Sequence, residues 1–247
     1  MITPNIPLLQ SMITQSGLLN SEALTEVVIT QKFNAAKAQA QRELRVFFEP
    51  TEILPSDVPQ AEVDALVTAN VAYHQESAYD YNPEMFSNGT FGFMVTKQTP
   101  LIAVHSIEFA YPSSTNVLFT VPHEWIRLDK KYGHINLVPT MLSAAIPISS
   151  YLLNIITGGK AIPLMMRLRY RAGLTDVSNT YPDIIELLNR MTVLSILKGS
   201  FLPSSGTLSV DGISRTAQIN MKDWQANIDD LMDSLRDSLH GVRLGFA

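Results

Sequence analysis

The last quarter of the chain constrains its fold more than any other stretch. Between residues 220 and 240, apolar side chains recur at spacings of four, three, four and four: Trp224, Ile228, Leu231, Leu235 and Leu239. This spacing places them along one side of an amphipathic helix. Asn220 stands where an N-cap is expected, and Gly241 follows the last apolar residue as a C′ glycine does. The pattern therefore predicts a helix over residues 220–240 with one buried face.

A preceding helix, expected over residues 180–198, is apolar around most of its circumference. Thr180 and Pro182 mark its start. A helix that is wet on one side keeps a polar face. We therefore expect this helix to be buried between the helix that follows and something else, either another segment or another subunit. Between the two helices, Asp211 and Gly212 predict a tight turn within a short hairpin.

The rest of the chain predicts three further segments. Residues 1–20 carry no charged side chain and suggest an extended N-terminal arm, and residues 21–92 predict helices followed by an aromatic loop. Residues 93–171 contain short runs of β-branched and aromatic residues between turn residues, which predict strands. Residues 172–247 hold the helical pair and a tail. We therefore expect an α+β fold in which a helical bundle from the N- and C-terminal segments carries a β-rich middle insertion.

Composition excludes several classes of function. The chain has 18 Lys and Arg against 23 Asp and Glu, a net charge of −5, so its overall charge does not favour coating nucleic acid. The absence of cysteine excludes disulfides, thiolate metal sites and a Cys nucleophile. No charged residue lies between Lys131 and Lys160, but Gly133, Pro139 and Pro147 would interrupt a helix there. No membrane span is therefore expected.

Catalytic patterns are sparse. His74 and His123 each lie close to a glutamate in sequence, but both stand beside aromatic and turn residues, where a structural histidine is the favoured interpretation. The histidine spacings do not match a zinc site on one helix, and no nucleophile elbow or complete phosphate-binding loop is present. We expect no enzymatic activity, no metal and no cofactor. A small hydrolase that uses His74 or His123 is the least favoured alternative.

The densest basic patch is formed by Lys160, Arg167, Arg169 and Arg171. Three of these residues alternate with apolar residues, so a strand would place them on one face. This face could contact phosphates or an acidic partner, or it could be an ordinary solvated face of a strand. The second interpretation is favoured for an isolated run of this kind.

Two stretches resemble virion structural proteins of tailed bacteriophages. The first runs from Pro122 to Pro139, with Trp125-Ile126-Arg127-Leu128, the turn Lys130-Lys131-Tyr132-Gly133 and Leu137-Val138-Pro139. The second is Ser209-Val210-Asp211-Gly212-Ile213-Ser214, followed by the amphipathic helix. Within these proteins the chain is most similar to neck proteins, the head-tail connectors or adaptors beneath the portal. In the order of its elements, the similarity extends over residues 45–245.

The resemblance implies a ring of identical subunits, commonly twelve, that binds the portal and other neck or tail proteins. It also implies that phage DNA passes transiently through the ring and that the protein is assembled in the host cytoplasm and resides in the virion. The expected contacts between subunits or partners are Ile184, Leu188, Met191, Trp224, Ile228, Leu231, Leu235, Leu239, Leu244 and Phe246. The alternative is a tail terminator, tail-tube or baseplate protein, which would also be β-rich and free of cysteine.

Overall fold

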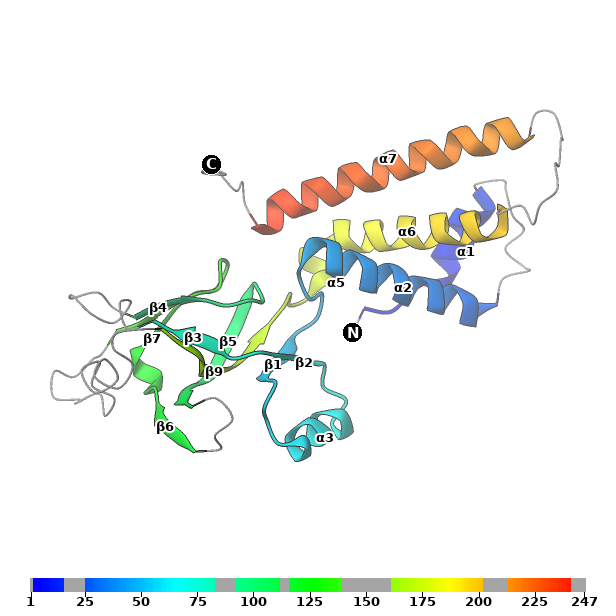
Figure 1. Cartoon of the computed structure of the whole chain (residues 1–247). Coiled ribbons are helices and arrows are strands. Elements are labelled where there is room, and N and C mark those ends of the chain that lie inside the picture. Colours follow the sequence, from blue (N-terminus) through cyan, green and yellow to red (C-terminus); the bar gives the residue numbers. More distant parts are fainter. Residues whose placement is uncertain are drawn as a thin grey trace. The chain divides into compact units, whose positions relative to one another are not determined.

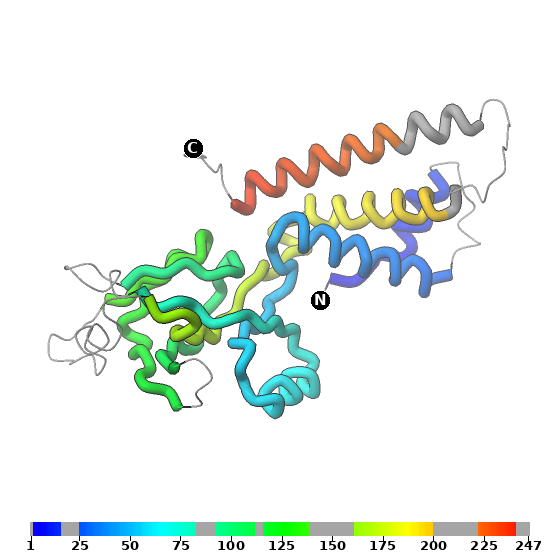
Figure 2. The backbone as a smooth tube through the Cα atoms, viewed as in Figure 1, coloured from blue at the N-terminus to red at the C-terminus, as the bar shows by residue number. Residues whose placement is uncertain are grey.

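A computed structural model describes residues 2–15, 25–82, 92–111, 116–138, 161–201 and 213–240 of the chain (Figure 1). The chain divides into two compact units, whose backbone can be followed in Figure 2. The first, the helical unit, combines Met1–Arg45 with Asp176–Ala247. The second, the sheet unit, is the continuous stretch Val46–Thr175.

The helical unit is built around one helix. Its helices are α1 (Ile6–Gln15), α2 (Glu26–Leu44), α5 (Val177–Thr180), α6 (Pro182–Phe201) and α7 (Ile213–His240). The helices α1, α2 and α7 all pack on α6, and Figure 1 shows α6 between α2 and α7. Because α6 has neighbours on three sides, Ile184, Leu187 and Leu188 have no exposed surface. This confirms the expected burial of α6 and shows that the other segments are α1 and α2 of the same chain.

Two helices differ in extent from the sequence expectation. An extended arm was expected at the N-terminus, but α1 is helical because Leu9 and Ile13, four residues apart, are both buried. Pro7 lies in the first turn of α1, where proline is tolerated. The helix α7 begins at Ile213 rather than at Asn220. The turn expected at Asp211 and Gly212 lies outside the described residues, and the residues that follow it belong to α7.

The larger sheet forms the centre of the sheet unit. Its strands are β1 (Thr51–Pro55), β2 (Tyr73–Glu76), β3 (Tyr79–Tyr81), β5 (Leu101–Ala110), β6 (Val117–Thr120) and β9 (Ile162–Ala172). The order is β2-β1-β9-β5-β6, and β3 pairs with β9 on the edge that β9 also shares with β1. The strands β1 and β2 are parallel and are joined by α3 (Gln60–Thr68), and the other pairs are antiparallel.

The longest strand, β9, shows why this sheet forms. Met166, Leu168 and Tyr170 are buried, whereas the residues between them are not, as expected for a strand with one face on the core. Arg167 and Arg169 lie on the outer face of the strand. The inner face packs into one hydrophobic cluster with residues of β1, β3 and β5.

A smaller sheet joins the same cluster. It has the order β4-β8-β7, from β4 (Gly92–Val95), β7 (Ile126–Asp129) and β8 (His134–Leu137), all antiparallel. The strands β7 and β8 form a hairpin across the turn Lys130-Lys131-Tyr132-Gly133. Its turn ends at Gly133, which has a φ of 69°, a conformation that glycine adopts without strain. Trp125, directly before β7, is 5% exposed and anchors the hairpin to the core.

The expected architecture of a terminal helical bundle with a β-rich insertion is wrong. The chain is α+β, but a central six-stranded sheet organises residues 46–175. Strands β1, β2 and β3 of this sheet precede residue 93, in the stretch where helices followed by an aromatic loop were expected. Their sequences carry little alternation: β2 is Tyr-His-Gln-Glu with only its last residue buried, and β3 has three residues. Pairing with longer neighbours, rather than their own pattern, makes them strands.

Candidate functional site

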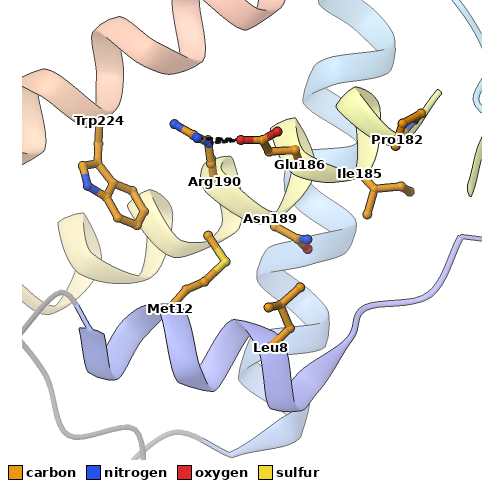
Figure 3. A pocket seen from close by; sticks show the side chains of 8 residues that line it. All are labelled: Leu8, Met12, Pro182, Ile185, Glu186, Asn189, Arg190 and Trp224. Atoms are coloured by element: carbon orange, nitrogen blue, oxygen red, sulfur yellow. Dashed lines mark hydrogen bonds and ion pairs between the residues drawn. The ribbon is translucent and has the colours of Figure 1, made fainter.

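A groove on the helical unit is a candidate site among the described residues. It has a volume of about 530 Å³ and is lined by Leu8, Met12, Pro182, Ile185, Glu186, Asn189, Arg190 and Trp224. Figure 3 shows α1 and α7 as its two walls and one side of α6 as its floor. The five floor residues lie at spacings of three, one, three and one along α6, which is one row of a helix. We call this feature the α6 groove.

The walls of the α6 groove are apolar. Leu8 and Met12 project from α1, and the indole of Trp224 projects from α7 (Figure 3). Leu9 and Ile13 of α1 point instead into the core, where both are fully buried. The 44% exposure of Leu8 therefore reflects an apolar side chain that faces the open groove.

The floor carries one buried polar group without a partner. Asn189 is 5% exposed, and its Oδ1 atom is buried and accepts no hydrogen bond. Figure 3 places the Asn189 amide between α6 and Leu8. Buried polar atoms are nearly always hydrogen-bonded, and an unpaired one calls for an explanation. A hydrogen-bond donor bound in the groove would supply the missing partner.

Glu186 and Arg190 form the charged rim of the groove. The Arg190 Nε and Nη2 atoms donate to Oε1 of Glu186 at 3.0 and 2.5 Å. Both side chains are partly exposed, so the pair contributes little to stability. The groove thus combines apolar walls, one unpaired acceptor and a rim with both signs of charge, a combination suited to a segment of protein.

The structure separates the expected interface residues into three groups. Ile184, Leu188, Met191, Ile228 and Leu235 are buried inside the helical unit. Trp224, Leu231 and Leu239 are half-buried at the flank of α7, and among them Trp224 lines the groove. Leu244 and Phe246 lie outside the described residues. Met232 is 5% exposed and belongs to the buried row of α7, although the sequence pattern did not include it.

The arginines of the expected basic patch are each paired with a carboxylate. Arg167 pairs with Asp57, and Arg171 donates from Nε to Oε1 of Glu52 at 2.6 Å. Arg169 pairs with Glu62 of α3, and this hydrogen bond raises the pKa of the guanidinium. Since these pairs offset the positive charge, this face of β9 offers a phosphate group little attraction. Lys160 lies outside the described residues.

A buried polar cluster lies on the inner side of the sheet. The Glu76 carboxylate accepts hydrogen bonds from Tyr79 at 2.6 Å and from Tyr170 at 3.1 Å. The phenol oxygens in turn accept from the backbone N–H groups of Lys97, at 2.8 Å, and Gln98, at 3.2 Å. Burial, as the largest cause, raises the pKa of both tyrosines. Each phenol is thus hydrogen-bonded as donor and acceptor, so the cluster reads as a structural network.

Within the part of the chain that the structure describes, neither His74 nor His123 forms a hydrogen bond or ion pair with a carboxylate. His74 is exposed on β2 and packs against the ring of Phe47 at 5.6 Å. His123 is exposed in the short 3₁₀ turn before β7. Within the described ranges, no group of three or more His, Asp or Glu side chains could hold a metal ion.

Comparisons with known proteins add no relative. No protein-family model and no curated protein matches this chain.

Among the helices that the structure describes, none is long and apolar enough to cross a membrane.

Sequence reasoning missed the groove, although one signal for it was present. Asn189 lies among the apolar residues of α6, and a polar residue at a buried position of a helix marks a special requirement. The apolar row of α1 was hidden because residues 1–20 were expected to be extended. Without that helix, the second wall could not be anticipated.

Proposed function

We propose that this chain is a non-enzymatic structural protein of a tailed-bacteriophage virion. In this proposal, identical copies form the head-tail connector, or adaptor, ring beneath the portal. The ring links the capsid to the tail and lines the passage of the DNA. Portal protein and other neck or tail proteins are its partners, and its location is the neck of the virion.

One observation carries the assembly role, namely the open α6 groove with its unpaired Asn189 acceptor. Apolar walls such as Leu8 and Trp224 cost free energy when they stay in water, so such a groove favours a protein occupant. The choice of a connector among assembly proteins rests on the resemblance of residues 122–139 and 209–214 to phage neck proteins.

The charge of the chain is consistent with the passage of DNA through the ring. The chain has a net charge of −5, and the arginines of β9 are paired with carboxylates. A channel lined by a protein of net negative charge has little overall attraction for phosphates, so DNA can slide through.

The mass of the purified protein in solution tests this proposal. Light scattering and negative-stain images should show a ring, either for the protein alone or after mixing with cognate portal protein. A protein that remains monomeric in both conditions would overturn the connector role.

The tail terminator, tail-tube or baseplate role is the second candidate, and strand β6 favours it. In the described sheet, β6 lies at an edge and exposes Val117 and Leu118, at 43% and 41%. An apolar edge strand can add a strand from a neighbouring copy. Hydrogen exchange on the assembled protein separates the two roles. Protection of residues 117–120 without protection of α1 and α6 would favour the tail.

A further inference from the structure

The position of the α6 groove within the helical unit limits what can fill it. The helices α1 and α7 each pack on α6 and each contact α2. The groove opens between α1 and α7, so it lies on the side of α6 away from α2. An occupant therefore needs one row of apolar side chains for the walls and a free donor for Asn189.

The chain itself carries such a segment after α7. Residues 242–246 read Val242, Arg243, Leu244, Gly245 and Phe246. In an extended segment alternate side chains share a face, so the three apolar residues form one row. Extended backbone also offers N–H groups, which need acceptors once they are buried. The positively charged guanidinium of Arg243 can form an ion pair with the Glu186 carboxylate at the rim.

The end of α7 indicates which copy supplies this segment. The last residue of α7, His240, hydrogen-bonds through Nε2 with the backbone oxygen of Leu44 at 2.6 Å. This contact holds the end of α7 on the side of α2, whereas the groove opens on the opposite side of α6. A neighbouring copy can approach the groove from its open side.

We propose that residues 242–246 of one copy bind in the α6 groove of a neighbouring copy. Val242, Leu244 and Phe246 pack against Leu8, Met12 and Trp224, and a backbone N–H of the segment donates to Oδ1 of Asn189. Since donor segment and groove are different surfaces, the contact can be repeated from copy to copy, and it forms a ring where the rotation between copies closes. The inference rests on the proposed ring assembly and identifies its subunit contact.

Cysteine cross-linking tests this contact directly, because the natural chain contains no cysteine. The double variant Leu8→Cys, Phe246→Cys should form disulfides between copies and give a ladder of oligomers on a non-reducing gel. Val67→Cys with Phe246→Cys is the matched control, since Val67 is 59% exposed on α3 of the sheet unit. The control pair should remain monomeric on the gel.

The alternatives give different results. A disulfide within one copy would overturn the proposal, because the segment would then fill its own groove. Rings that form without any Leu8–Phe246 cross-link would overturn the contact but leave the connector role standing. The absence of rings under all conditions would overturn both.

Fluorescence provides a second measurement that does not depend on a disulfide. In a Trp125→Phe background, Trp224 is the only tryptophan and reports on the groove. Its emission should shift to the blue as the protein concentration rises, and Phe246→Asp should remove this shift and raise the concentration for half-assembly about ten-fold or more. Val67→Asp should change neither. A blue shift that is independent of concentration, or that persists in Phe246→Asp, would contradict the proposal.

Discussion

Asn189 joins stability and binding in a single side chain. Its Oδ1 atom is buried without a hydrogen bond in the isolated chain, and an unpaired buried acceptor costs about 1–3 kcal/mol. A bound donor would recover much of this free energy. The residue thus disfavours the empty groove and favours the occupied one.

Asn189→Leu should therefore separate the two properties. Leucine has a similar size and leaves no unpaired polar atom, so the free energy of unfolding of the monomer should rise by about 1 kcal/mol or more. The concentration for half-assembly should rise as well, because the acceptor is lost. Urea denaturation and light scattering measure the two effects. A variant that is less stable and assembles normally would show that Asn189 is only a packing residue.

Tyr79 and Tyr170 make stability depend on alkaline pH. Burial raises the pKa of both phenols above their usual value of about 10. Above that pH the unfolded chain releases protons that the folded chain retains, so the free energy of unfolding falls as pH rises. Below that pH, the folded and the unfolded chain both hold these protons, so the two tyrosines make their full contribution to the free energy of unfolding.

Tyr170→Phe tests this dependence. The variant should be less stable near neutral pH, because Glu76 loses one of its two donors. Between about pH 9 and about pH 11, its free energy of unfolding should fall less than that of the natural chain. Urea denaturation at the two pH values provides the comparison. An equal fall in both proteins would mean that Tyr170 ionises as readily when folded as when unfolded.

Among the elements, α7 is held by a narrow buried row. Leu235 is 1% exposed, whereas Leu231 is only half-buried. Leu235→Ala should therefore lower the free energy of unfolding by about 2–4 kcal/mol, and Leu231→Ala by clearly less. Urea denaturation of the pair measures the difference. Equal losses in the free energy of unfolding would mean that Leu231 is packed as tightly as Leu235, which would contradict the buried row of α7.

The helix α3 is attached to the outer face of β9 by an ion pair between Glu62 and Arg169 that reaches solvent. Side-chain exposures of 29% for Arg169 and 42% for Glu62 limit what this pair contributes. Arg169→Gln should lower the free energy of unfolding by about 0.2–1 kcal/mol, and the loss should shrink in concentrated salt. Denaturation at low and high ionic strength checks this. A loss that does not depend on salt would assign the contribution of Arg169 to packing.

Elements with a regular pattern of their own could be predicted from the sequence, and elements defined by their neighbours could not. The apolar circumference of α6 and the alternation of β9 each fix one buried surface. By contrast, β2 and β3 depend on pairing with other strands, and α1 depends on packing against α6. The arginines of β9 illustrate the same limit, since their alternation was evident but their carboxylate partners come from β1, α3 and the loop between them.

At the scale of the whole molecule, the two units differ in continuity. The sheet unit is one stretch of chain, whereas the helical unit needs residues from both ends. A fragment covering residues 46–175 should fold alone and show a β-type circular dichroism spectrum with a cooperative thermal transition. A fragment of residues 176–247 should not, because α6 lacks α1 and α2. A cooperative transition in the second fragment would contradict this division.

Because the helical unit is built from two separate stretches of chain, its helices emerge from the ribosome at different times. Its first helices emerge early, yet Leu9 of α1 and Phe33 of α2 are buried only once α6 has followed. The sheet unit, whose last strand ends at Ala172, can close before then. Since α6 is the floor of the groove and α7 one of its walls, a nascent chain lacks the groove until both helices have been synthesised. Incomplete chains are thereby kept out of any assembly that depends on the groove.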